Sequence, residues 1–97
     1  MQSGYWQDRT TADFRLVDPE TTVALLPVAA IEQHGPHLPL STDAVINDGV
    51  VSAALALVSS RTTLLVLPAL SVGLSPEHTS FPGTLSKTGH AAQSMSV

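Results

Sequence analysis

The sequence contains no cysteine among its 97 residues, which excludes disulfide bonds and thiolate metal sites. Basic residues are also few, because four lysines and arginines stand against eight aspartates and glutamates, and the formal net charge is -4. So little positive charge offers no basic patch for a phosphate backbone or an anionic bilayer. We therefore expect neither nucleic acid nor a membrane as a partner.

Long apolar segments are missing as well. No apolar run reaches the roughly 18 residues that are needed to cross a bilayer. The first residues, "MQSGYWQDRTTADF", have neither the cationic start nor the apolar core of a signal peptide. The sequence therefore predicts a cytoplasmic protein.

Hydrophobic residues make up 43% of the chain and charged residues 12%, a composition typical of a folded domain. A domain of this length buries only roughly two-thirds of its unfolded surface. The apolar content exceeds what so small a core needs. We expect apolar faces that pack against further protein, either a missing C-terminal part or partner subunits.

The first half of the chain predicts a short helix and a strand. Thr10 and Thr11 are suitable caps for a helix over residues 12–17. Residues 21–31, "TTVALLPVAAI", are too continuously apolar for a half-exposed strand and predict one buried on both faces, as in a parallel sheet. Pro27 predicts an irregularity near the end of that strand.

Helical periodicity begins after Thr42. Apolar residues recur every four positions, at Ile46, Val50, Ala54 and Val58, with Val51 and Leu55 beside them, and predict an apolar stripe. Asn47 and Asp48 lie inside the helix and are expected to face solvent. Residues 63–70, "TLLVLPAL", predict a second buried strand, which completes a βαβ unit with a right-handed crossover.

Two loops follow the carboxyl ends of these strands, where ligands bind in open α/β sheets. They comprise residues 32–42 and 71–84, and together they hold three of the four histidines. If the strands are neighbours, the loops face each other across one crevice.

The first loop, "EQHGPHLPLST", has the residue types of a metal site. Pro36 and Pro39 disfavour helix and hold the segment extended, so that Glu32 and His34 point the same way. Imidazole and carboxylate together suit zinc, manganese or iron. Asp43 could reach back to the pair and bridge two ions, and two metals about 3.5–4 Å apart can share a hydroxide.

Other interpretations of these residues stay open. Asp43 could serve only as a helix N-cap, and Glu32 and His34 could belong to a plain surface loop. His37 could support a ligand from outside or brace the loop. In the second loop, Glu77 and His78 could contact substrate, carry a proton or simply be exposed. Glu32, His34 and Asp43 alone do not complete a two-metal site.

The strings "LLPVAAIEQHGPHLPLSTD" and "LPALSVGLSPEHTSFPGTLS" resemble the N-terminal part of the creatininase (creatinine amidohydrolase) family, over about residues 3–86. The resemblance implies a layered α/β/α fold with a mainly parallel sheet, of which residues 1–97 form a single incomplete domain with only the first βαβ part. It implies metal-dependent hydrolysis of a C–N bond, other than a peptide bond, in a small cyclic or linear amide. Family members are often hexameric, so a homo-oligomer is expected.

The resemblance also implies roles for single residues. Asp43 would bridge two divalent ions, with Glu32 on one and His34 on the other, and a metal-bound hydroxide would be the nucleophile. Residues 71–84 would shape the substrate pocket. The resemblance assigns no role to His37, Glu77 and His78, which the residue pattern alone leaves as candidates to contact the substrate or support the ligands from outside.

The chain also departs from the family pattern. Family chains are more than twice as long and supply further metal ligands later, whereas residues 87–97, "KTGHAAQSMSV", form an atypical tail. We expect an N-terminal fragment that is inactive alone. The alternative is a non-catalytic metal-binding or subunit-assembly module. The second loop is shorter than the glycine-rich loop of creatinine-specific members, so relatives that open formamides or process peptides remain alternatives.

Overall fold

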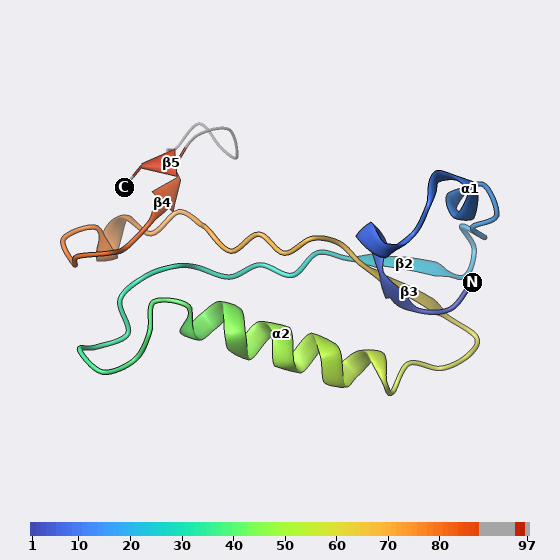
Figure 1. Ribbon diagram of the computed structural model, residues 1–97, viewed down its shortest axis with the longest axis horizontal. Helices are drawn as coiled ribbons and strands as arrows, with labels where there is room; N and C mark the ends of the chain where they lie inside the picture. Colours follow the sequence, from blue (N-terminus) through green and yellow to red (C-terminus); the bar gives the residue numbers. More distant parts are fainter. Residues whose placement is uncertain (88–94, 97) are drawn as a thin grey trace. The chain divides into compact units, whose positions relative to one another are not determined.

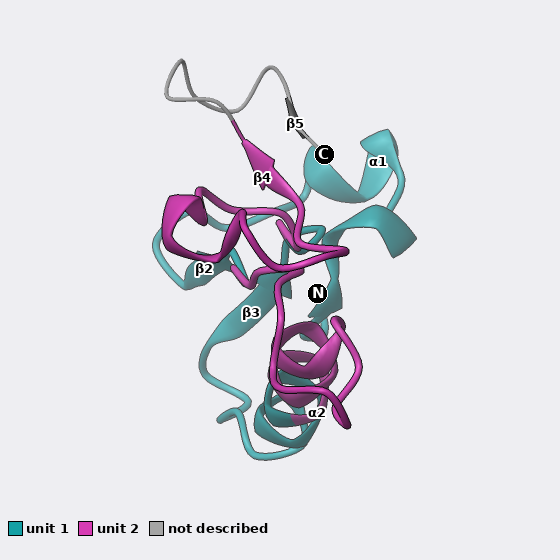
Figure 2. Ribbon diagram, turned by 90° about the vertical axis from the view of Figure 1, so that its left-hand side faces the viewer, with its two compact units in different colours: residues 1–27, 50–69 teal, residues 28–49, 70–97 magenta. Residues whose placement is uncertain are grey.

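The structure is a computed structural model that describes residues 1–87, 95 and 96 (Figure 1). Most of the predicted tail, residues 88–94 and 97, lies outside the described residues. Contacts divide the chain into two compact units, Met1–Pro27 with Val50–Ala69, and Val28–Gly49 with Leu70–Val97 (Figure 2).

The first unit holds a three-stranded parallel sheet. Its strand order is β1 (Gly4–Tyr5), β3 (Thr63–Val66) and β2 (Thr22–Leu25), and β3 pairs in parallel with both neighbours. The predicted pairing of the two apolar strands, and with it the α/β class, is confirmed. Strand β1 was not predicted; Ser3, just before it, accepts a hydrogen bond from the Leu64 backbone N–H at 2.8 Å.

The central strand carries the core of this unit. Leu65 is 0% exposed and Val66 is 2% exposed, so the burial predicted for residues 63–70 holds for the second half of β3, whereas Leu70 beyond the strand is 43% exposed. The same prediction for residues 21–31 is wrong, because β2 is an edge strand of only four residues and its Val23 is 51% exposed. The strand ends at Leu25, two residues before Pro27, which has no N–H for the ladder.

Helix α1 (Thr11–Phe14) follows the 3-10 helix η1 (Trp6–Asp8). The predicted cap is confirmed as a capping box: Thr10 Oγ1 accepts from Asp13 N–H at 3.1 Å, and Asp13 Oδ2 accepts from Thr10 N–H at 2.9 Å. The helix is shorter than the predicted range of residues 12–17. The hydrogen bond from the Thr10 backbone holds the pKa of Asp13 below its ordinary value.

This capping box should make the stability of the chain depend on pH. A carboxyl whose pKa is lower in the folded state stabilises that state above the unfolded pKa, which is near 3.8, and loses this effect as the pH falls through the folded value. We expect Asp13→Asn to lower the melting temperature near pH 6 and the difference to shrink toward about pH 2. Thermal unfolding of both chains measures it. A difference that is the same at every pH would contradict the role of the carboxylate.

Helix α2 (Thr42–Leu55) begins at Thr42, one residue before the predicted start. Of the predicted apolar stripe, Ile46 is 61% exposed and Val50 is 63% exposed, and only Val51, predicted beside the repeat, is buried. Apolar residues occur on more than one side of this helix, so periodicity alone could not select the face. Asn47 also departs from expectation, because its side-chain amide donates to the Val28 carbonyl at 2.9 Å.

The second unit is built from the segments that follow β2 and β3. Val28 and Leu70 form a parallel bridge, and the Leu85 N–H donates to the Ile31 carbonyl at 2.8 Å. The two predicted loops also meet, because the Gln33 backbone N–H donates to Thr84 Oγ1 at 3.2 Å. The unit also holds the 3-10 helix η2 (Pro76–His78) and an antiparallel pair, β4 (Ser86–Lys87) and β5 (Met95–Ser96).

Burial among the described residues is limited. Within residues 1–87, only three hydrophobic residues are buried, Val51, Leu65 and Val66. Large apolar side chains are exposed in both units, which agrees with the expectation of apolar faces open to further protein. Within residues 1–87, 95 and 96, no helix combines the length and apolarity needed to cross a membrane.

Candidate metal centre

Three predicted ligands come together in the second unit. Glu32, His34 and Asp43 each offer a ligand atom, and these atoms lie within 4.8 Å of one another. The chain reverses direction between them through a turn that includes Gly35, whose φ of 78° lies in the left-handed region that favours glycine. Helix α2 begins at Thr42, so Asp43 lies inside its first turn rather than at its N-cap.

The His34 ring is fixed at both nitrogens. Its Nδ1 lies 2.9 Å from the Glu32 backbone carbonyl and its Nε2 lies 2.9 Å from Asp43 Oδ1. A carbonyl oxygen can only accept, so Nδ1 carries the hydrogen and Nε2 is the nitrogen available to a metal. Histidine ligands of metals are commonly oriented in this way by a backbone carbonyl.

The same contacts shift the titration of His34. The hydrogen bond to the Glu32 carbonyl raises the pKa of His34, partial desolvation opposes this, and the Asp43 carboxylate raises it further. Without a metal, the structure therefore favours the imidazolium, which donates to both acceptors. A metal ion at Nε2 would have to displace that proton.

A second group shares Glu32 with the first. His78 Nε2 lies 3.7 Å from Glu32 Oε2 and 3.7 Å from Glu77 Oε1, and these three residues also have ligand atoms within 4.8 Å of one another. The Glu32 side chain is only 16% exposed, whereas Glu77 is largely exposed. His37 belongs to neither group and lies exposed in the turn.

Sequence reasoning missed Gln33, which links the two loops. Its backbone N–H donates to Thr84 Oγ1 at 3.2 Å, its Oε1 accepts from the Gly35 N–H at 3.0 Å, and its Nε2 lies 3.0 Å from His78 Nδ1. The available signal was alternation: in an extended segment with Glu32 and His34 on one side, the residue between them points to the other.

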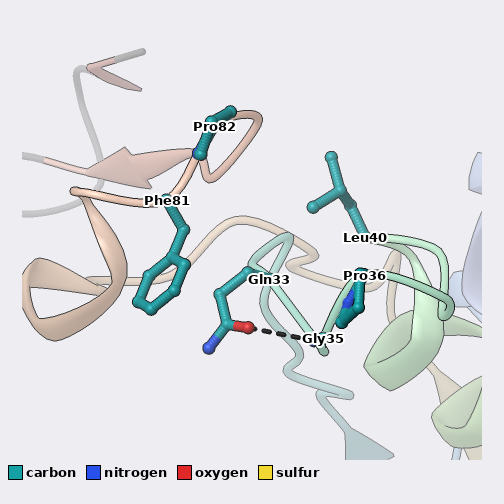
Figure 3. Close-up of a pocket in the computed structure, with 6 residues that line it drawn as sticks. All are labelled: Gln33, Gly35, Pro36, Leu40, Phe81 and Pro82. Carbon is teal, nitrogen blue, oxygen red and sulfur yellow. Dashed lines mark hydrogen bonds between the residues drawn. The ribbon is translucent and has the colours of Figure 1, made fainter.

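A cavity of about 360 Å³ lies beside Gln33. Its lining is mostly apolar and consists of Gln33, Gly35, Pro36, Leu40, Phe81 and Pro82 (Figure 3). Figure 3 shows the Gln33 amide between the Phe81 ring and the turn at Gly35 and Pro36. This volume is within the range of small-molecule sites, and one polar group among apolar walls is a common arrangement in them.

Comparison with known proteins agrees with this geometry. Residues 7–96 match the creatininase (creatinine amidohydrolase) family. The chain belongs to the creatininase family. It is 43% identical over 67 residues to the mycofactocin precursor peptide peptidase of Mycobacterium ulcerans (strain Agy99), covering 64% of this chain and 27% of that protein.

Two further relatives show the same partial coverage. The mycofactocin precursor peptide peptidase of Mycolicibacterium smegmatis (strain ATCC 700084 / mc(2)155) is 37% identical over 78 residues, 78% of this chain and 32% of that protein. The creatinine amidohydrolase of Pseudomonas putida is 36% identical over 72 residues, 69% of this chain and 26% of that protein. The chain therefore spans about a third or less of the length of these relatives. No solved structure matches it significantly.

The donor atoms of the site fit the metal dependence of the family. Both groups combine carboxylate oxygens with an imidazole nitrogen, the set that suits zinc, manganese or iron without any thiolate. His34 in addition has its second ring nitrogen on a backbone carbonyl, as a metal ligand requires.

Proposed function

We propose that this chain is part of a metal-dependent amidohydrolase that cleaves a C–N bond of a small cyclic or linear amide. The observation that carries the proposal is the convergence of Glu32, His34 and Asp43, whose ligand atoms lie within 4.8 Å of one another. Membership of the creatininase family supports the reaction class.

In this proposal each ligand has its own task. Two divalent ions, zinc, manganese or iron, would supply Lewis acidity and make water a stronger nucleophile at neutral pH. Asp43 offers two oxygens and would serve both ions, with Glu32 on one and His34 on the other. The Glu32 carbonyl keeps the His34 ring oriented, so Glu32 contributes through its backbone as well as its side chain.

The substrate would lie against the second loop. The apolar cavity beside Gln33 would receive the part of the amide substrate that does not react. Glu77 and His78 would face the polar end of the substrate. The names of the relatives include a creatinine amidohydrolase and a peptide peptidase, so both cyclic and linear amides are candidate substrates.

One observation favours the second candidate function, a non-catalytic metal-binding or subunit-assembly module. Val45, Ile46 and Val50 form an exposed apolar surface on α2. Such a surface is suited to packing against further protein, and in the amidohydrolase proposal it would join subunits of a homo-oligomer.

Metal content and activity separate these candidates. After dialysis against zinc or manganese and then buffer, elemental analysis should find bound metal that a chelator removes, and a chain with Glu32, His34 and Asp43 all replaced by alanine should hold none. Hydrolysis of creatinine, formamides or short peptides that the triple replacement abolishes would support the amidohydrolase. Because the chain is expected to be inactive alone, metal binding without hydrolysis agrees with both candidates, and equal metal in both chains would contradict the site.

A further inference from the structure

Two groups of possible ligands share Glu32, and one contains His34 whereas the other contains His78. Each histidine has Nε2 within 4 Å of a carboxylate oxygen, at 2.9 Å for His34 and 3.7 Å for His78, so both are close enough to share a metal with it. What separates them is the hydrogen-bond partner of the opposite ring nitrogen, Nδ1, because this partner decides which nitrogen carries the hydrogen.

The Gln33 amide has a fixed orientation. Its Oε1 lies 3.0 Å from the Gly35 backbone nitrogen, drawn as the dashed line in Figure 3. A backbone N–H can only donate, so the amide atom that faces it must be the carbonyl oxygen. The NH₂ end is thereby turned away from Gly35.

That NH₂ end determines the state of His78. Gln33 Nε2 lies 3.0 Å from His78 Nδ1, and an amide NH₂ can only donate, so Nδ1 must accept. A neutral imidazole has one accepting and one donating nitrogen, so Nε2 of His78 carries the hydrogen. This N–H faces Glu32 Oε2 and Glu77 Oε1, each 3.7 Å away.

The two histidines therefore differ at Nδ1, which accepts in His78 and donates in His34. Because Nδ1 of His34 stays protonated on the Glu32 carbonyl, Nε2, which faces Asp43, is the nitrogen that can give up its proton to a metal. In His78, the nitrogen that faces the carboxylates has no lone pair to give to a metal. The Phe81 ring, with its centroid 6.2 Å from that of His78, lies on the same loop and helps to confine the ring.

We propose that Gln33 is a positioning residue: it holds His78 with Nε2–H toward Glu32 and Glu77, so that His78 presents a hydrogen and not a lone pair to the carboxylates and does not bind the metal. The tautomer follows from this chain alone. The exclusion of His78 from the ligands rests on the proposed function, because it presupposes a metal on Glu32, His34 and Asp43.

The tautomer can be read in the metal-free chain by long-range ¹H–¹⁵N correlation spectra, which report which ring nitrogen of each histidine is protonated. With His78 assigned from a His78→Ala chain, we expect its Nδ1 to be unprotonated and its Nε2 protonated at a pH above the histidine titration. A His78 that is protonated at Nδ1 in the unaltered chain would overturn the proposal.

Gln33→Glu is the decisive variant because it preserves one contact and reverses the other. One carboxylate oxygen still accepts from the Gly35 N–H. The second oxygen replaces the NH₂ group that donated to His78 Nδ1 and can only accept, so His78 Nδ1 should become protonated. Gln7→Glu, at an exposed glutamine of η1, adds the same charge and should leave His78 unchanged. An unprotonated Nδ1 in the Gln33→Glu chain would overturn the proposal.

Two further measurements keep the test decisive. If Gln33→Glu does not fold, Gln33→Ala should fold and show a mixture of His78 tautomers, and an unmixed Nε2–H tautomer there would overturn the role of Gln33. In zinc titrations, His78→Ala should retain affinity within a few-fold, whereas His34→Ala should lose it. Equal losses of zinc affinity in the two chains would overturn the exclusion of His78 from the ligands. If neither chain lost affinity, the result would count against the metal centre, and the spectra would still decide the role of Gln33.

Discussion

Replacing Asp43 with alanine should lower the affinity of the chain for zinc or manganese by more than about a hundredfold, the upper range for residues that merely support a ligand. The substitution removes two carboxylate oxygens from the candidate centre. It also removes the acceptor 2.9 Å from His34 Nε2, so that the ring loses one of its two fixed contacts. Isothermal titration of the metal-free chain with each ion measures the loss.

Two control variants isolate the role of Asp43. Asp48→Ala removes the same charge from the same helix at an exposed position, and His37→Ala removes an exposed imidazole from the preceding turn. Neither residue belongs to the groups of possible ligands, so each should change the affinity by a few-fold at most. If Asp48→Ala weakened binding as much as Asp43→Ala, the effect would be one of net charge and Asp43 would not be a ligand.

The sequence predicts the fold where apolar residues are concentrated. The parallel pairing of β2 with β3 follows from two apolar runs separated by a helix, and the structure confirms it. Strand β1 has only two residues, too few for a periodic pattern, and its position depends on Ser3 contacts with Thr62 and Leu64 about sixty positions away. Such contacts between distant residues have no local signature.

The candidate site also has one part that the sequence predicts and another part that it does not. Glu32, His34 and Asp43 attract attention from residue type and spacing, because carboxylates and imidazoles are the usual oxygen and nitrogen ligands. Gln33 and Thr84 are neutral and 51 positions apart, and their hydrogen bond exists only because the two loops lie together. A glutamine that selects a histidine tautomer can be found only once both partners of its amide are known.

Leu65→Ala should have the largest effect on stability, with a loss of roughly 2–5 kcal/mol. Leu65 is 0% exposed on the central strand, and it is one of only three buried hydrophobic residues within residues 1–87. Because small domains have unfolding free energies of only about 5–15 kcal/mol, a loss of this size would remove a large fraction of the stability. Urea unfolding followed by circular dichroism measures it.

Leu57→Ala is the matched control, since it deletes the same atoms from a side chain that is 85% exposed. Substitutions at such surface positions usually change stability by about 0.5 kcal/mol or less. A Leu65→Ala chain that unfolded at the same urea concentration as Leu57→Ala would mean that the sheet core contributes little. In that case the exposed apolar side chains, packed against further protein, would have to supply the stability that the described core does not.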